Sequence, residues 1–329
     1  ETGEVTEKDL NIKTGATMIE NSTGRIISFV GGRGYEEDNK NYAFYNTRPN
    51  GSTMKPLLGY APAMELGLFQ PGTPIPDVKF QIGDWAPTNY ISSSENGIVS
   101  AREALARSYN IPATRLMSAL LEVDNNPGRY LTKMGITEPH EESNVNHRPS
   151  VLGSFFTTVE ETTVGFTTLA NGGKKAEPYM IEKITDEDGN VVFEHEIEET
   201  EVFSPQTAYL TIDMLRDVIN NGTATYIKSR LNNTNVDWAG KTGTSQYIQD
   251  AWFVGSNPNV TVGTWLGYGQ YDLDGQGGEP SYYEEQILNL RNCNGCSLSY
   301  SQRNTGFWSE LVNAAAEIDP ELVTQSTRH

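Results

Sequence analysis

The chain has 329 residues, 36% hydrophobic and 20% charged, a composition that excludes a disordered or fibrous protein and allows one large domain or two modest ones. Its formal charge of −19 and its pI near 4.6 exclude a broad basic surface for nucleic acid, so any anionic ligand must be bound by a few local cations. No run of about 18 apolar residues and no signal-peptide pattern occurs in the sequence.

The first part of the chain predicts a hairpin followed by a buried helix. Two apolar runs within residues 16–32 flank the turn sequence 21–24, which ends in glycine. From residue 53 to residue 68, apolar side chains recur at helical spacing, which predicts a largely buried helix. Pro56 is tolerable only near the start of that helix, and Pro62 predicts a kink within it.

The next segment predicts a loop and two helices. Residues 69–97 contain four prolines and are expected to be an extended loop. Residues 100–103 have the pattern of a capping box, which predicts a helix that runs to Arg107, and a second helix is expected after Pro112. Residues 108–110 then lie in the joint between the two helices.

The C-terminal half predicts two pairs of strands and two helices. They are a hairpin around 188–190, a helix over 205–220, antiparallel strands at 251–255 and 260–268, and a last helix over 308–318. Trp252 and Trp265 lie at alternating positions within the predicted strands, so we expect both side chains in the core. Strand sequences at both ends with helices between them predict one α/β domain whose sheet is built from distant pieces.

Ser52 and Lys55 are the first candidate catalytic pair. A spacing of three residues places both side chains on one face of a helix. A serine hydroxyl becomes a nucleophile when a base takes its proton, and an amine serves as that base once its pKa has fallen. The positive potential of a helix N-terminus favours both changes. Alone, the SxxK pattern also fits a capping serine followed by a surface lysine.

Ser108 and Asn110 form the second candidate group. A serine in a loop can relay protons between Lys55 and a leaving amine, and an asparagine amide can bind a peptide group of a substrate. The alternative is a plain turn in which Asn110 stops a helix. The SxN pattern alone does not decide between the two.

The third group is Lys241-Thr242-Gly243-Thr244, directly before a predicted strand. Gly240 and Gly243 are expected to let the backbone of a ligand approach an exposed sheet edge and dock as an added strand. Lys241 supplies positive potential, and the hydroxyls of Thr242 and Thr244 are suited to a terminal carboxylate. The alternative is an ordinary turn.

No metal site is expected. Cys293 and Cys296 form a CxxC pair without a histidine or third cysteine nearby, so zinc would lack ligands. A local disulfide and two free thiols remain as alternatives. The four histidines show no ligand spacing and are expected to be solvated.

SxxK, SxN and KTG in this order resemble the signature of the penicillin-recognising serine enzymes. Longer stretches resemble the transpeptidase domain of class A (high-molecular-weight) penicillin-binding proteins, roughly from Gly15 to Gly269. These stretches are STGRIISFVGG, NGSTMKPLLGYAPAMELG, APTNY, IVSAREALARSYNIPA, FTTLANGG, YLTIDMLRDVINNGTA and AGKTGTSQYIQDAWFVGSNPNVTVGTWLGY. Asn50 departs from the family's usual proline, and Tyr109 from the aspartate of β-lactamases, but neither change removes a group that the mechanism needs.

The resemblance implies a fold and its boundaries. The fold is the α/β (α+β) fold of penicillin-binding transpeptidases and serine β-lactamases, with a central antiparallel sheet flanked by helices and an all-helical region. Residues 1–14 are expected to be a linker or a cloning remnant, 15–320 the transpeptidase domain, and 321–329 a flexible tail.

The resemblance also implies a mechanism. Ser52 attacks the penultimate carbonyl of a D-Ala-D-Ala stem peptide with Lys55 as base, and the N–H groups of Ser52 and Thr244 form an oxyanion hole. Ser108 passes a proton to the departing D-Ala, Asn110 holds the donor peptide, and an amine of a second stem takes the acyl group. The terminal carboxylate is bound by the KTGT segment, Lys241, Thr242, Gly243 and Thr244. No metal or organic cofactor is implied.

The implied partners are peptidoglycan stem peptides and β-lactam antibiotics, without nucleic acid; cell-wall synthesis or division proteins are further candidates. By the same resemblance, the full-length protein has a membrane anchor and a glycosyltransferase domain, and works at the extracytoplasmic face of the bacterial membrane.

Two other functions stay open. One is a hydrolase, either a D,D-carboxypeptidase or a β-lactamase, in which water replaces the amine. The ExxLN pattern of the deacylating glutamate is absent near Glu141 and Glu142, which favours slow deacylation over turnover. The other is a penicillin-binding sensor module without catalysis, against which the full set of polar groups argues.

Overall fold

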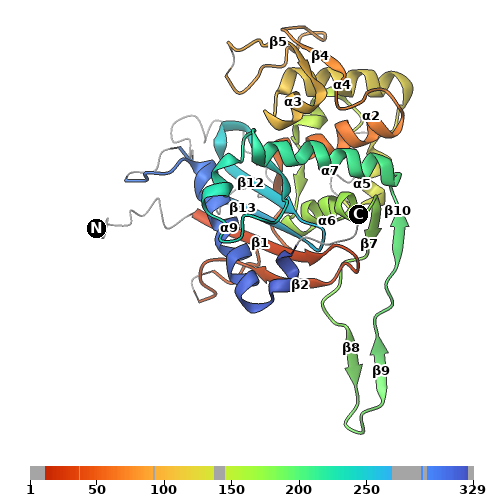
Figure 1. Cartoon of the computed structure of the whole chain (residues 1–329), viewed down its shortest axis with the longest axis vertical. Helices are drawn as coiled ribbons and strands as arrows, with labels where there is room; N and C mark the ends of the chain where they lie inside the picture. Colours follow the sequence, from red (N-terminus) through yellow and green to blue (C-terminus); the bar gives the residue numbers. More distant parts are fainter. Residues whose placement is uncertain are drawn as a thin grey trace, which may run out of the picture.

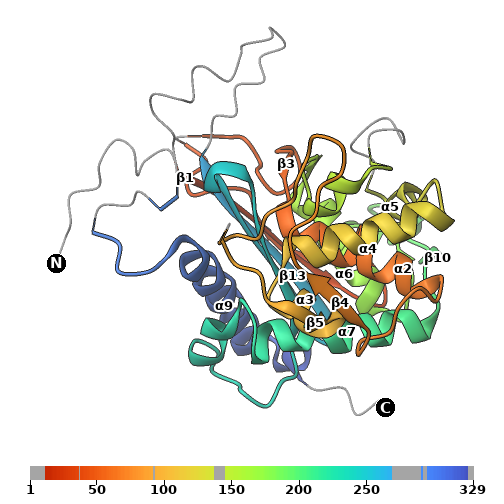
Figure 2. The ribbon, with the colours of Figure 1, turned by 90° about the horizontal axis from the view of Figure 1, so that it is seen from above.

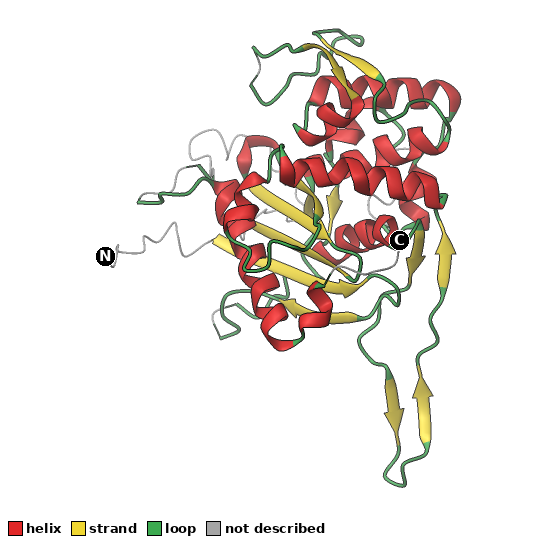
Figure 3. Ribbon diagram, viewed as in Figure 1, coloured by secondary structure: helices red, strands yellow, loops and turns green. Residues whose placement is uncertain are grey.

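The structure is a computed structural model that describes residues 12–36, 38–91, 93–136, 145–268, 290–291 and 295–324. Figures 1 and 2 show a central sheet with helices on both faces and a helical region beside it. Figure 1 also shows a long hairpin that projects from the body. The same view coloured by secondary structure separates these parts (Figure 3). The predicted α/β fold with a central sheet and an all-helical region is confirmed.

The elements have the following bounds. The strands are β1 (Ile12–Glu20), β2 (Ile26–Val30), β3 (Arg48–Pro49), β4 (Pro74–Asp77), β5 (Gly97–Ser100), β6 (Phe156–Thr157), β7 (Lys174–Ala176), β8 (Lys183–Thr185), β9 (Val191–Glu194), β10 (Glu199–Glu201), β11 (Ala239–Thr244), β12 (Asp250–Ser256) and β13 (Val260–Tyr268). The α-helices are α2 (Ala61–Glu65), α3 (Ala101–Ala106), α4 (Asn110–Val123), α5 (Gly128–Lys133), α6 (Val159–Ala170), α7 (Pro205–Asn220) and α9 (Tyr300–Ile318). Shorter helical turns are η1 (Gly51–Thr53), the π-helix η2 (Lys55–Tyr60), η4 (Arg148–Leu152), η5 (Thr225–Ser229), η6 (Gln246–Ile248) and η7 (Pro320–Val323).

The central sheet joins segments from both ends of the chain. Its strand order is β11-β12-β13-β1-β2, and the pairing of β1 with β13 runs from Ile12 opposite Tyr268 to Glu20 opposite Val260. All neighbouring strands are antiparallel. The N-terminal hairpin and the two strands predicted after residue 250 are therefore confirmed, and β11 lies at an edge of the sheet.

Helices α6 and α9 cover opposite faces of the sheet (Figure 2). A Cβ atom on Gly263 would lie 2.0 Å from Thr163 Oγ1 of α6, and one on Gly255 would lie 2.5 Å from the Trp308 ring of α9. Gly255 pairs with Val262, so Gly263 points to the other face because side chains alternate along a strand. Glycine at both positions lets the helices approach closely.

The helical region packs against the β11 edge. Helix α7 contacts β11 and α3, while α4 contacts η2 and η4. Buried apolar side chains from both parts, among them Leu57, Met117 and Phe253, belong to one continuous core. Trp252 and Trp265 are 2% and 0% exposed, as predicted for core residues. Segment η1–η2 thus passes through the junction of the two parts.

The predicted helix from 53 to 68 is instead three consecutive segments, η1, η2 and α2. Ala61 N–H donates to Pro56 O, a bond that spans five residues and belongs to a π-helix. Pro62 has no N–H to donate and lies in the first turn of α2, directly after the change of helix type. Near Pro62, where the sequence predicts a kink, the chain therefore changes from a π-helix to an α-helix.

Three predicted boundaries shift. Within the predicted loop 69–97, β4 forms and pairs with β5; Pro74 and Pro76 are accommodated because a two-stranded sheet has only edge strands. Helix α4 begins at Asn110, two residues before Pro112. Helix α9 begins at Tyr300, eight residues before the predicted start, because Ser299 and Gln302 form a capping box that the prediction missed.

The predicted helix over 205–220 and the predicted hairpin around 188–190 are confirmed as α7 and as β8–β9. The structure extends past both predicted domain boundaries, since β1 begins at Ile12 and Val323 of η7 is buried. Cys296 is disulfide-bonded, whereas Cys293, Glu141 and Glu142 lie outside the described residues. Within the described ranges, no helix is long and apolar enough to cross a membrane.

Candidate active site

Ser52 lies in η1, where the backbone is held between β11 and the loop at Gly153. Gly51 has φ of +55°, and a Cβ there would lie 2.3 Å from Thr244 O. Gly51 N–H donates to Gly153 O at 3.0 Å, and a Cβ on Gly153 would lie 2.0 Å from Gly51 O. Only glycine fits at these two positions, which place Ser52 beside the sheet edge.

Lys55 is fully buried in η2. Its Nζ donates to Ser108 O at 2.6 Å and to Asn110 Oδ1 at 2.7 Å, and lies 3.2 Å from Ser108 Oγ. Burial holds the pKa of Lys55 well below its ordinary value, and the charge of nearby Lys241 lowers the pKa further. A neutral amine in this position can accept a proton.

Lys241 of β11 is also fully buried and contacts the same serine, Ser108. Its Nζ donates to Ser108 Oγ at 2.8 Å and to Thr242 O at 3.0 Å. Burial lowers the pKa of Lys241 to about 7. Ser108 itself has φ of +59°, a left-handed conformation that non-glycine residues adopt at a cost. One strained serine therefore connects the two lysines.

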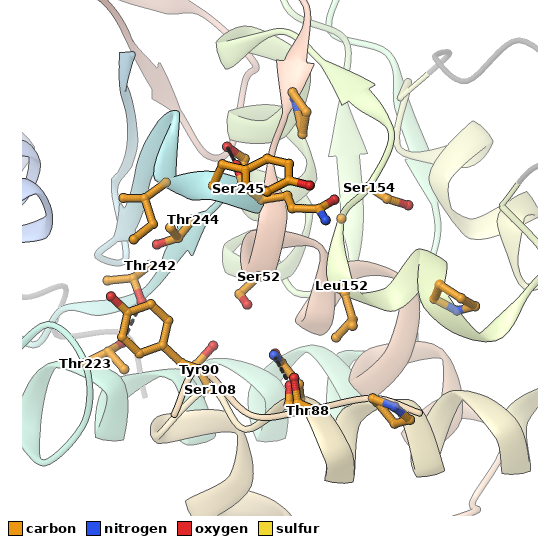
Figure 4. Close-up of a pocket in the computed structure, with 18 of the residues that line it drawn as sticks. Ser52, Thr88, Tyr90, Ser108, Leu152, Ser154, Thr223, Thr242, Thr244 and Ser245 are labelled. Atoms are coloured by element: carbon orange, nitrogen blue, oxygen red, sulfur yellow. Dashed lines mark hydrogen bonds between the residues drawn. The ribbon is translucent and has the colours of Figure 1, made fainter. Parts of the chain in front are cut away.

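The Ser52 hydroxyl points into the space between Ser108, Thr242 and Leu152 (Figure 4). It forms no hydrogen bond with any residue that the structure describes, Lys55 included. The sequence placed Ser52 and Lys55 on one helical face, whereas the structure puts the Lys55 amine against Ser108 and leaves the Ser52 hydroxyl facing the cleft.

Asn110 is positioned by residues to which the sequence assigned no role. Its Nδ2 donates to Thr88 O at 2.8 Å, and its backbone N–H donates to Asn89 Oδ1 at 2.8 Å. Asn89 Nδ2 in turn donates to the carboxylate of the fully buried Asp77 at 2.9 and 3.0 Å. Thr88 and Asn89 belong to the APTNY stretch, so resemblance marked the segment but not its function as a support of Asn110.

The hydroxyls of β11 face the cleft. Thr242 Oγ1 lies 2.6 Å from Thr223 Oγ1, and Thr242 and Thr244 both line the cleft. Ser245 N–H donates to Asp250 O across the strand pair. Because bonded and non-bonded residues alternate along an antiparallel pair, the N–H of Thr244 points outward from the sheet edge. The edge therefore presents a backbone donor beside Ser52.

Gly240 and Gly243 make room for the chain itself. A Cβ on Gly243 would lie 2.3 Å from Asn50 O, and one on Gly240 would lie 2.7 Å from the Phe253 ring. This corrects the expectation that the space beside both glycines admits a ligand. Gly243 instead allows β11 to approach the backbone that precedes Ser52.

A buried ion pair supports the end of β11. Arg48 Nε donates to Asp250 Oδ1 at 2.7 Å, and the two side chains are 2% and 0% exposed. Asp250 also accepts from Ser245 Oγ at 2.6 Å and from Trp265 Nε1 at 2.9 Å. The Asp250 carboxylate of β12 thus joins β13, β3 and the residue that follows β11.

The candidate residues converge on one cleft of about 850 Å³. Ser52, Ser108, Asn110, Thr242 and Thr244 line it, and the two lysines lie buried behind Ser108. The part of the chain that the structure describes holds no cluster of three or more His, Cys, Asp or Glu residues suited to a metal ion. The arrangement supplies a nucleophile, amines with lowered pKa values, and donors for an anion.

Comparisons with known proteins show the family of the chain. The family model described as "Penicillin binding protein transpeptidase domain" matches residues 14–283. Penicillin-binding protein 1F of Bacillus subtilis is 35% identical over 273 residues, which are 80% of this chain and 36% of that protein. Penicillin-binding protein 1A of Clostridium perfringens strain 13 is 32% identical over 274 residues, 78% of this chain and 39% of the relative. The chain therefore spans well under half of these relatives.

Solved structures share the fold. Penicillin-binding protein 1A of Haemophilus influenzae superposes with a TM-score of 0.76 at 22% identity, over 94% of this chain and 48% of that one. PonA1 of Mycobacterium tuberculosis in complex with penicillin V gives a TM-score of 0.77 at 19% identity, over 98% of this chain and 82% of that one. The resemblance inferred from the motifs is confirmed, and the chain belongs to the penicillin-binding protein transpeptidase domain family.

Proposed function

We propose that the chain is a serine D,D-transpeptidase that cross-links peptidoglycan stem peptides through an acyl-enzyme on Ser52, and that β-lactams acylate the same hydroxyl. The observation that carries the proposal is Ser108, whose hydroxyl lies 3.2 Å from Lys55 Nζ and 2.8 Å from Lys241 Nζ in the cleft that Ser52 lines. Two buried lysines with lowered pKa values around Ser108 form a route for protons. If Ser52 only capped a helix, no such route would be needed.

Acylation begins when Ser52 Oγ attacks the carbonyl carbon of the penultimate D-Ala. The Lys55 amine takes the hydroxyl proton, since Ser108 O and Asn110 Oδ1 hold its N–H groups and leave its lone pair available. The proton then passes through the Ser108 hydroxyl to the peptide nitrogen. The C–N bond breaks, D-Ala leaves as a neutral amine, and the peptide remains as an ester on Ser52.

Charge that develops on the carbonyl oxygen is stabilised by backbone donors. We assign this role to the N–H groups of Ser52 and Thr244. The Thr244 N–H points out from the sheet edge beside Gly51, whose backbone packs closely against Thr244. Asn110 Nδ2 uses one hydrogen for Thr88 O and has a second for an amide carbonyl of the donor peptide.

The terminal carboxylate of the donor is assigned to β11. The hydroxyls of Thr242 and Thr244 donate to it, and Lys241 supplies positive charge from behind the strand. Gly243 keeps β11 against the Ser52 backbone, so its role in binding is to hold this edge in place. No cofactor takes part in the scheme.

Deacylation repeats these steps in reverse with a new amine. The amine of a second stem peptide attacks the ester carbonyl, Lys55 takes its proton, and Ser52 regains its hydroxyl as the cross-link forms. A β-lactam forms the same ester, but its leaving nitrogen stays attached to the acyl group. It therefore remains near the site and blocks the approach of an amine.

For the full-length protein, we propose a membrane anchor and a glycosyltransferase domain in addition to these 329 residues. We take the transpeptidase domain, expected over 15–320, to include all of β1 and η7. The chain covers 36% of Penicillin-binding protein 1F of Bacillus subtilis, which leaves room for both. The domain would then act at the extracytoplasmic face of the bacterial membrane, with cell-wall synthesis or division proteins as partners.

Labelling with a fluorescent penicillin, followed by intact-mass measurement, tests the proposal. The wild-type chain is expected to gain one acyl adduct, and Ser52→Ala to gain none. Ser229→Ala removes an exposed hydroxyl outside the cleft and is expected to label like the wild type. Unchanged labelling of Ser52→Ala would refute the assignment of the nucleophile.

The fate of the adduct separates the transpeptidase from the alternatives. With a stem-peptide donor and an excess of an amine acceptor, a transpeptidase yields the amide product, detected by mass. Rapid loss of the penicillin adduct over many turnovers would indicate a hydrolase instead. A chain that is acylated but releases no product from any donor would be a sensor module.

A further inference from the structure

Arg107 is a charged residue of the cleft that the proposed acylation does not use. Among the described residues that line the cleft, it is the one with a charged side chain, although the chain as a whole carries a formal charge of −19. An anionic substrate is repelled by the overall field of such a protein. A single exposed cation at the cleft then has a large influence on which ligands enter.

The guanidinium of Arg107 is available for a ligand. The residue is exposed, its backbone N–H donates to Glu103 O at 2.8 Å, and its side chain has no ion pair or hydrogen bond with a described residue. Arg102, earlier in the same segment, instead forms ion pairs with the carboxylates of Asp213 and Asp217 on α7. An unpaired guanidinium offers planar, paired donors that match a carboxylate.

Arg107 lies at the end of the cleft where the β11 hydroxyls are found. The residue before it, Ala106, accepts the backbone N–H of Thr223 at 3.3 Å. Thr223 Oγ1 is in turn 2.6 Å from Thr242 Oγ1. Figure 4 shows Thr223 and Thr242 together on one side of Ser52, with Leu152 and Thr88 on the other. Arg107 thus belongs to the side of the leaving group.

The carboxylate site on β11 lacks a full, permanent positive charge. The Thr242 and Thr244 hydroxyls are neutral, and burial lowers the pKa of Lys241 to about 7, so its charge is partly lost near neutral pH. Two of the Lys241 N–H groups are already donated to Ser108 Oγ and Thr242 O. An arginine stays protonated at every pH at which the protein is folded.

We propose that Arg107 is a specificity-determining residue that binds the free carboxylate at the leaving-group end of the substrate. It supplies the charge that β11 lacks and selects donors and β-lactams that carry a carboxylate over neutral analogues. The inference rests on the proposed acylation of Ser52, since the carboxylate is defined by its place relative to that nucleophile.

The test compares an anionic and a neutral ligand. The second-order rate constant of acylation is measured by intact mass with benzylpenicillin and with its methyl ester. Arg107→Gln is expected to slow benzylpenicillin about tenfold, equivalent to about 1.4 kcal/mol, and to leave the ester unchanged. Arg107→Lys keeps the charge and should restore the rate to within about threefold. Lys228→Gln removes an exposed cation outside the cleft and should change neither rate.

Ionic strength gives a second readout. Added salt should slow benzylpenicillin acylation of the wild type more than that of Arg107→Gln, because the wild type has one more cation at this site. Equal slowing of both ligands by Arg107→Gln would show a structural role and overturn the inference. An unchanged benzylpenicillin rate would also overturn it while leaving Ser52 acylation intact; a wild-type chain that benzylpenicillin fails to acylate would overturn both proposals.

Discussion

The cleft and the β8–β9 hairpin both depart from the usual distribution of side chains, in which charged groups are exposed and apolar groups are buried. In the cleft, Lys55 and Lys241 are both 0% exposed and are surrounded by hydrogen-bond partners. In the hairpin, which projects from the body (Figure 1), Val192 is 67% exposed and Phe193 is 43% exposed. The chain thus buries amines in its interior and displays apolar side chains on a protrusion.

The difference shows which part carries stability and which carries function. The cleft is backed by the continuous core and by the buried Arg48–Asp250 pair, so its polar groups are held in a dry and rigid surrounding that shifts their pKa values. The hairpin is a two-stranded ribbon without a core of its own, an arrangement that is only marginally stable. We expect substitutions to have large effects in the first region and small effects in the second.

The largest difference, in the rate of acylation, is expected when a lysine is replaced by methionine in each of the two regions. Lys55→Met removes the proposed base with little change in volume, and should lower the rate of acylation by about 10²- to 10⁴-fold, the usual contribution of a positioned base. Lys183→Met on β8 should leave the rate unchanged, since its loose pairing with Glu194 is 3.9 Å long and exposed. Stopped-flow labelling measures both. A Lys55→Met enzyme within tenfold of the wild type would remove Lys55 from the mechanism.

A second contrast concerns the energy of apolar packing. Phe253 is 0% exposed and packs edge-on against Trp308, so Phe253→Ala should lower the free energy of unfolding by about 3–5 kcal/mol. Phe193→Ala removes a cross-strand contact with Ile184, and should cost at most about 1 kcal/mol. Urea unfolding of both variants measures these changes in the free energy of unfolding. Similar losses would mean that the hairpin belongs to the cooperative core.

The smallest expected effect is on the pH profile. The pKa of Lys241 is about 7, so the lysine loses its proton, and the carboxylate site its charge, as the pH rises through that value. The second-order rate constant for benzylpenicillin should therefore be about tenfold lower at pH 8.5 than at pH 6.5, since this constant reports the free enzyme. The part of the rate that persists at pH 8.5 in the wild type but is lost in Arg107→Gln is the part that Arg107 supplies.

Glu160 provides the control for this profile. Burial raises its pKa to about 7 as well, but the residue does not line the cleft. Glu160→Gln should leave the fall in rate above pH 7 unchanged. A wild-type profile that stays flat between pH 6.5 and 8.5 would contradict the role of Lys241 as the titrating cation.

Much of the fold followed from local pattern. The helix from Pro205 to Asn220 and the strands on either side of residue 258 were predicted because capping residues and apolar alternation act within a few residues. Predictions failed where distant contacts override propensity. Strand β4 forms from proline-containing sequence because β5, about 20 residues later, pairs with it. The segment after Ser52 is a π-helix, a helix type that the apolar spacing did not distinguish.

The three motifs and their order identified the family, since each needs only the residue type and its spacing. Their mutual geometry did not follow from the sequence. That Ser108 lies between two lysines from positions 55 and 241, that Asn89 and Asp77 hold Asn110, and that Gly243 makes room for Asn50 are consequences of packing between segments far apart in the chain.

The sequence by itself determined the chemical groups: a hydroxyl, two amines, an amide and a row of threonines, each in a recognisable local pattern. The tertiary structure alone decided the protonation state of these groups and which partners they contact. Burial removes water from the two amines and so lowers their pKa values, while Arg107 is exposed and forms no ion pair with a described residue. Desolvation and pairing depend on which segments meet in space, and no local pattern contains that information.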